Sequence, residues 1–125
     1  MSNADDRRHF HRILFDAEVR LNDDGHGWQA KLIDISMKGV LMECPAEWSG
    51  AKGDHFTLEI PLGEGGEAIR MAALLAHAER GHLGFEWQDI DVESFSHLRR
   101  LLELNLGDPN LVNRELSELS GQLAD

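Results

Sequence analysis

Residues 28–44, WQAKLIDISMKGVLMEC, contain two largely apolar runs joined by a short polar segment. The first run covers residues 28–35, and the second covers residues 40–44, where Pro45 ends it. Between them, residues 36–39 combine a serine hydroxyl with a glycine, which is typical of a turn. The stretch therefore predicts two antiparallel strands joined by a tight connection.

Four further segments have the periodicity of strands. Apolar and polar residues alternate over residues 15–21, 56–62 and 83–87, as expected of a strand with one buried face. Residues 68–80 are rich in alanine and could form a helix, but the glycine-containing turns on both sides favour a long strand. Six antiparallel strands are expected in all.

Beyond Ile90 the apolar period becomes that of helices. Asp91 is a suitable N-cap, and the helical spacing of apolar residues continues to Gly107, which is a stop signal. A second helix is expected from Pro109, with an apolar stripe at Val112, Leu116, Leu119 and Leu123. The whole pattern predicts a mainly β protein, a small six-stranded antiparallel barrel or tightly coiled sheet with the first helix over an open end.

These elements form one domain in three parts. We expect a flexible N-terminal arm over residues 1–12, a β-barrel over 13–90 and a C-terminal helical segment over 91–125. A chain of 125 residues that is 42% hydrophobic suits a single core. The arm is polar with few apolar anchors, so it should be disordered alone and become ordered on a ligand. Residues 2–4 could belong to the protein or to a cloning vector.

Charge and motifs exclude several classes of function. With 23 acidic against 12 basic residues, the net charge of −11 disfavours nucleic acid and anionic membranes as partners. No apolar run reaches the roughly 18 residues of a membrane span, and the charged N-terminus lacks a signal peptide, so a cytoplasmic location is expected. The histidines show no metal-binding spacing, and no serine lies in a nucleophile elbow. We therefore expect that the protein binds no metal or cofactor and is not an enzyme.

An arginine cluster stands out against this acidic background. Residues 7–12, RRHFHR, place Arg7, Arg8 and Arg12 just ahead of the first expected strand, and residues 34–39, DISMKG, close the second. As R-R-x-x-x-R followed by D-x-S-x-x-G, the two segments resemble the two-part signature of PilZ domains, bacterial receptors for the second messenger cyclic di-GMP. The resemblance extends over the strands, the GHLGFEW segment at 81–87 and the C-terminal helix, and it implies a six-stranded barrel.

The resemblance also implies a ligand site. It assigns cyclic di-GMP binding to Arg7, Arg8, Arg12, Asp34, Ser36 and Gly39. His77 falls near the place where some members put an aromatic residue beside the ligand, and it could stack weakly there or be a surface histidine. A basic residue directly before R-x-x-x-R, here Arg7, goes with a stacked ligand pair in related domains. Two cyclic di-GMP molecules per chain are therefore expected.

The residue types suit such a ligand. A guanidinium fork can bind phosphate oxygens or guanine O6 and N7 in pairs, and its flat face can stack on a purine. The Asp34 carboxylate can accept from guanine N1 and N2, while Ser36 offers a hydroxyl. Gly39 lets the backbone turn sharply or pass close to the ligand.

Simpler explanations remain open for the same residues. The arginines could form a solvated arm, and Asp34, Ser36 and Gly39 could form an Asx-type turn, which is compatible with binding. Phe10 is expected to pack on the barrel rim rather than stack on a base. The stripe from Val112 to Leu123 could pack on its own domain or, like the acidic barrel face, meet a partner.

The expected function is a cyclic di-GMP receptor that changes conformation and signals in trans to an unidentified protein partner, because no kinase, cyclase or glycosyltransferase segment accompanies the motifs. The resemblance suggests control of motility, pili, biofilm or exopolysaccharide. The alternative is a PilZ-fold interaction module that has lost ligand binding. A single-strand nucleic-acid binder is disfavoured by the acidic charge and the absence of tyrosine.

Overall fold

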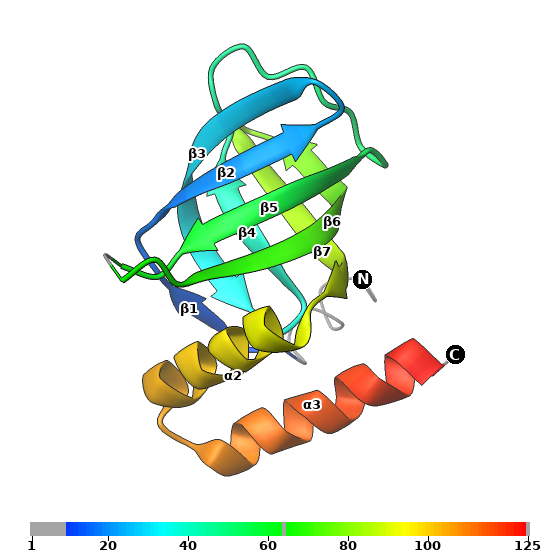
Figure 1. The fold of residues 1–125 in the computed structure, drawn as a ribbon. Helices are drawn as coiled ribbons and strands as arrows, with labels where there is room; N and C mark the ends of the chain where they lie inside the picture. The colour runs from blue at the N-terminus through cyan, green and yellow to red at the C-terminus, as the bar shows by residue number, and fades with distance from the viewer. Residues whose placement is uncertain (1–9, 64, 125) are drawn as a thin grey trace.

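Six antiparallel strands close into a barrel in the computed structural model, which describes residues 10–63 and 65–124 (Figure 1). Neighbouring strands follow the order β3-β2-β5-β6-β7-β4, and β4 also pairs with β3, which closes the sheet. The prediction of a six-stranded barrel is confirmed. The strands are β2 (Glu18–Asp23), β3 (His26–Ser36), β4 (Gly39–Glu43), β5 (His55–Pro61), β6 (Ala68–Glu79) and β7 (His82–Ile90).

The long strand β6 resolves the ambiguity of the alanine-rich segment. It pairs with β5 on one side and with β7 on the other, so it lies inside the sheet. Alternate side chains point into the barrel and are almost fully buried, namely Ile69, Met71, Ala73 and Leu75. This period of two is that of a strand and not of a helix.

The N-terminal part of the barrel differs from the expected single strand over residues 15–21. A short strand β1 (Arg12–Leu14) pairs with the end of β3, and β2 begins only at Glu18. Between the pairs Leu14↔Asp34 and Glu18↔Lys31, the segment that links β1 to β2 advances by one residue more than the paired segment of β3. This extra residue is a β-bulge. The odd-numbered apolar residues continue through the bulge, so the sequence pattern did not reveal it.

Residues 10–12 belong to the folded body and not to a free arm. The side chain of Phe10 is only 3% exposed, so it packs against the barrel as expected. Arg12 begins β1. Arg7 and Arg8 lie outside the described residues, and so does the rest of the predicted arm over residues 1–9.

Two helices follow the barrel and lie together beyond one of its ends (Figure 1). Helix α2 (Val92–Leu106) begins where the Asp91 carboxylate accepts from the backbone N–H of Ser94 at 3.1 Å, and it ends at Gly107, whose φ is 71°. Both end signals read from the sequence are therefore confirmed. Leu98 and Leu102 are fully buried, and α2 contacts β6, so this helix covers the barrel end as expected.

Helix α3 (Pro109–Ala124) packs against α2. In its apolar stripe, Val112 is fully buried and Leu119 is 5% exposed, so the described part of the stripe belongs to the core and does not offer a free partner surface. Glu115 is also buried, at 1% exposed, and its Oε2 accepts from the backbone N–H of His11 at 2.8 Å. His11 Nδ1 lies 2.5 Å from the same oxygen. The last helix is thus tied to the residue just before β1.

Within the described part of the chain, neither helix combines the length and apolar character that crossing a bilayer requires.

Candidate ligand-binding site

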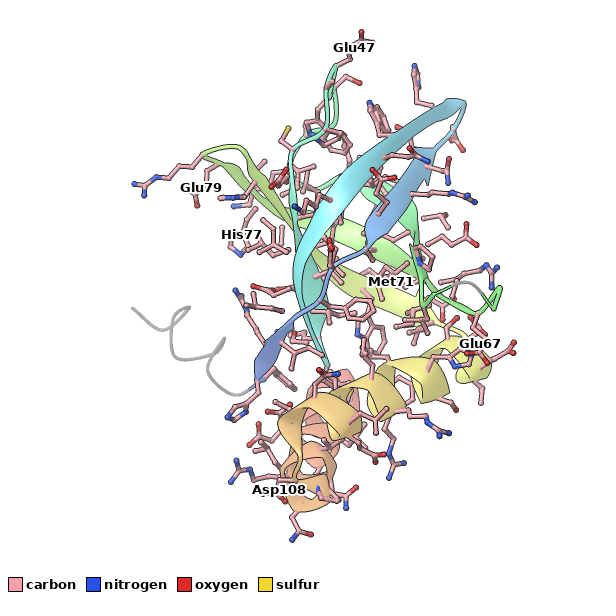
Figure 2. The ribbon with its side chains drawn as sticks, turned by 90° about the vertical axis from the view of Figure 1, so that its left-hand side faces the viewer. Glu47, Glu67, Met71, His77, Glu79 and Asp108 are labelled. Carbon is pink, nitrogen blue, oxygen red and sulfur yellow. The ribbon has the colours of Figure 1, made fainter. Side chains whose placement is uncertain are left out.

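A cavity of about 640 Å³ opens where the end of β3, the strand β4 and the β6–β7 hairpin meet. Its lining includes every sequence-predicted site residue that the structure describes, which are Arg12, Asp34, Ser36, Gly39 and His77. Their Cα atoms come together through strand pairing, because β3 pairs with β4, β4 with β7 and β7 with β6. Figure 2 shows His77 and Glu79 on one side of the barrel, where β6 and β7 line this cavity.

Strand β1 brings Arg12 to the cavity. The pairing of β1 with β3 sets Arg12 opposite Ser36 and Leu14 opposite Asp34. Arg12 Nη1 lies 3.8 Å from Asp34 Oδ2, with the arginine side chain 44% exposed and the aspartate side chain 15% exposed. The guanidinium is therefore half open to solvent and only loosely held, which leaves it able to turn toward a ligand.

Burial gives Asp34 an unusual electrostatic position. Loss of solvent, the larger influence, raises the pKa of its carboxyl above the ordinary value of 3.8, and the Arg12 guanidinium lowers it in part. A desolvated carboxylate near a cation is a strong hydrogen-bond acceptor. Asp34 is thus placed to accept from a ligand that brings N–H donors into the cavity.

This burial predicts that Asp34 costs stability in the ligand-free protein. Because the folded pKa is raised, the folded chain binds protons more tightly than the unfolded chain, so stability falls as pH rises from 3.8 through the raised value. We expect Asp34→Asn to raise the Tm at neutral pH, and the gain to shrink as pH is lowered toward 3.8. Thermal melts of both proteins between pH 3.8 and neutral pH measure this difference in Tm. Asp89→Asn, on the exposed side of β7, is the control and should leave the Tm unchanged; a lower Tm for Asp34→Asn would contradict the prediction.

Ser36 holds the turn between β3 and β4. Its Oγ accepts from the backbone N–H groups of Lys38 at 3.2 Å and of Gly39 at 3.3 Å. The residue is 8% exposed, yet it lines the cavity. The turn expected from DISMKG is therefore present, and the Ser36 hydroxyl contributes to it.

Strand β7 fixes the same turn from the other side. The Trp87 indole N–H donates to the carbonyl of Met37 at 2.7 Å, and the Trp87 backbone N–H donates to the carbonyl of Lys38 at 3.2 Å. A Cβ atom on Gly39 would lie 2.1 Å from the Phe85 carbonyl oxygen, so only glycine fits here. Gly39 thus serves first to let β4 and β7 approach closely.

His77 lies against a second glycine. Strand pairing sets His77 opposite Gly84, and a Cβ on Gly84 would come within 3.3 Å of the imidazole Cδ2. The ring therefore covers the backbone of β7 in the cavity wall. Gly84 of β7 is in turn paired with Leu41 of β4, and Leu41 is paired with Asp34 of β3. Asp34 and His77 therefore lie in one row of paired residues across four strands.

Sequence reasoning missed several cavity residues. Lys38, Arg80, His82 and Glu86 also line the cavity, and the Lys38 ammonium lies 5.9 Å from the centre of the Phe10 ring. Lys38 stands inside the DISMKG motif and could have been found there. Arg80 lies in the turn of the β6–β7 hairpin and His82 follows that turn, so an explicit hairpin register, which pairs His77 with Gly84, would have placed them nearby.

Comparison with known proteins shows the family of this chain and proteins that share its fold. A model of the PilZ domain family matches residues 6–104. The PilZ domain of YcgR from Escherichia coli, solved with c-di-GMP, is 20% identical and superposes with a TM-score of 0.61, covering 92% of this chain and 98% of that chain. YcgR from Escherichia coli in complex with c-di-GMP is 19% identical with a TM-score of 0.64, covering 94% of this chain and 50% of that one.

The inhibitor of motility MotI/DgrA from Bacillus subtilis is also similar, with 19% identity, a TM-score of 0.62 and coverage of 78% of this chain and 52% of that chain. The present chain thus spans about half the length of YcgR and of MotI/DgrA. At these identities the similarity to the solved structures shows a common fold.

Proposed function

Because this chain belongs to the PilZ domain family, we propose that it is a receptor for cyclic di-GMP and binds it in the cavity lined by Arg12, Asp34, Ser36, Gly39 and His77. The observation that carries the proposal is that Arg12 of the first motif segment lines the same cavity as Asp34, Ser36 and Gly39 of the second, although the two segments are far apart in the sequence. Arg7 and Arg8, which precede β1 by a few residues, would complete the site.

The chemistry of the cavity fits two phosphates and two guanines. The half-exposed Arg12 guanidinium can bind phosphate oxygens or guanine O6 and N7 with two parallel N–H groups. The partly buried Asp34 carboxylate can accept from guanine N1 and N2, where adenine presents no such donor pair. A contact of this kind discriminates between bases by about 1–3 kcal/mol. The site therefore favours a guanine dinucleotide over its adenine counterpart.

We further propose that two ligand molecules bind per chain, because Arg7 supplies a basic residue directly before R-x-x-x-R. Isothermal titration calorimetry with cyclic di-GMP, and with GTP and cyclic di-AMP as controls, tests both proposals. Micromolar or tighter binding of cyclic di-GMP alone is the expected result, with a stoichiometry of two. A stoichiometry of one would refute the role of Arg7. Absence of heat and of a thermal shift would refute the receptor function and favour a ligand-independent interaction module.

The contact between α3 and the segment before β1 supports a conformational output. His11, which Glu115 holds through the His11 backbone N–H and imidazole, is the immediate neighbour of Arg12. A ligand that draws the arginines onto the cavity would pull on this contact and change how α3 lies on the barrel. A protein partner in the cytoplasm would read that change, in control of motility, pili, biofilm or exopolysaccharide.

Glu115→Ala is expected to loosen α3 without ligand. The variant removes the carboxylate that accepts the His11 N–H, so amide hydrogen exchange in α3 should accelerate toward the level that cyclic di-GMP induces in the wild type. Glu103→Ala, which breaks only the Arg99 to Glu103 surface pair, is the control and should leave the exchange in α3 unchanged. Exchange in α3 that does not respond to cyclic di-GMP would contradict the proposed output.

A further inference from the structure

The cavity extends well beyond the motif residues. Its course follows β4, whose pairing with β7 runs from Gly39↔Glu86 at one end to Glu43↔His82 at the other. Arg12, Ser36 and Lys38 lie at the Gly39 end, and Asp34 and His77 lie in the middle row. At about 3.3 Å per residue, the five-residue strand separates its two ends by roughly 13 Å. The far end of the cavity is therefore out of reach of the Arg12 side of the site.

That far end has a cation of its own. Arg80 lines the cavity at the tip of the β6–β7 hairpin, and His82 lines it beside Arg80. On the barrel wall and the helices, Arg20 and Arg70 pair with Glu59, and Arg99 pairs with Glu103. Among the carboxylates that the structure describes, none is paired with Arg80 in this way. The Arg80 guanidinium is exposed and available to an anion.

The backbone of Arg80 is also unusual. Its φ is 57°, in the left-handed region that residues other than glycine rarely adopt, and Gly81 follows with a φ of 79°. Two such residues form the tight turn that a two-residue hairpin needs, and asparagine or glycine is the common choice at the first position. An arginine in this place is unfavourable for the turn itself. Strain of this kind, at a position that lines a cavity, points to a role for the side chain.

We infer that Arg80 is a phosphate-binding residue of a second subsite, which holds the outer of two stacked cyclic di-GMP molecules. The inference rests on the proposed receptor function and assigns this chain's own residue to the second molecule. The inner molecule meets Arg12 and Asp34, and the outer one places a phosphate at the far end of the cavity, within reach of the Arg80 fork. His82 borders the same subsite. Two carboxylates, Glu79 and Glu86, also line the cavity.

The test uses a substitution that cannot harm the turn. Arg80→Gly removes the guanidinium and fits the left-handed φ, so the fold should be kept or stabilised. Titration with cyclic di-GMP is expected to give two molecules for the wild type and one for Arg80→Gly, with the affinity of the remaining site unchanged. In Arg80→Lys the second molecule should bind about 10-fold more weakly than in the wild type, because lysine keeps the charge but lacks the planar fork.

Glu47→Gly is the matched control. Glu47 is the other non-glycine residue of positive φ in the described chain, with a φ of 58°. It lies in the β4–β5 loop, away from His77 and Glu79 (Figure 2). The Glu47→Gly variant should bind two molecules. If Arg80→Gly also binds two with unchanged affinity, or binds none, the second subsite is wrongly assigned while the receptor function stands. A wild type that binds one molecule overturns the subsite alone, and a wild type that binds none overturns the receptor function with it.

Discussion

Arg12→Ala is expected to weaken cyclic di-GMP binding at least about 100-fold and to leave the fold intact. Arg12 is the arginine of the first motif segment that the structure places in the cavity, and its guanidinium is the group that can bind phosphate or guanine in pairs. Its pair with Asp34 spans 3.8 Å with the arginine 44% exposed, so losing that pair costs the free protein little. Calorimetric titration and a thermal melt of the same sample measure both quantities.

The controls for this prediction separate chemistry from charge. Arg12→Lys keeps the positive charge and should not restore affinity, because an ammonium group lacks the two parallel donors. Arg20→Ala removes an exposed strand arginine that pairs with Glu59 on the barrel wall, and it should bind like the wild type. If the Tm of Arg12→Ala collapses, Arg12 is a structural residue and its assignment to binding is wrong.

Gly39→Ala is expected to destabilise the barrel by about 3 kcal/mol or more, a large part of the 5–15 kcal/mol that holds a typical domain together. The added Cβ would lie 2.1 Å from the Phe85 carbonyl oxygen, which is backbone and cannot rotate away. Strands β4 and β7 would have to separate, and the hydrogen bonds from Trp87 to the turn would be strained. Urea unfolding with far-UV detection measures the loss.

Gly65→Ala is the control for the same change of residue type, because no atom lies within 4 Å of the Cβ it would add. Its stability should match that of the wild type. A Gly39→Ala protein that unfolds at the wild-type urea concentration would show that β4 and β7 are not as close as the structure has them. The glycine of the second motif segment therefore has a packing role that is separable from ligand contact.

Much of the fold could be predicted because its signals are local. Alternating residues marked the strands, and Asp91 and Gly107 marked the ends of α2 through side-chain and backbone chemistry that acts within one turn. The bulge between β1 and β2 could not be predicted, since the alternation continues through it. Strand order could not be predicted either, because the pairing of β4 with β7 joins residues that are 39 to 47 positions apart.

The residues of the candidate site likewise differ in whether local sequence could reveal them. Asp34, Ser36 and Gly39 could be named because they stand within six consecutive residues that match a family motif, and Arg12 because it stands in an arginine cluster. Arg80 and His82 were missed because they reach the cavity only when the β6–β7 hairpin is laid against β4. The buried Glu115 was missed because a charged residue beside an apolar stripe normally faces solvent, and its partner His11 lies at the other end of the chain.

The seam between β4 and β7 also bears on how the protein folds. The β3–β4 and β6–β7 hairpins can each form from near neighbours in sequence, but the β4–β7 ladder must bring distant segments together, and such long-range pairing forms slowly. The two walls of the cavity meet at this ladder. A ligand bound across it has no site in a half-closed barrel, so it should slow unfolding without hastening folding. The lifetime of the native protein would then rise and fall with the concentration of the proposed ligand, cyclic di-GMP.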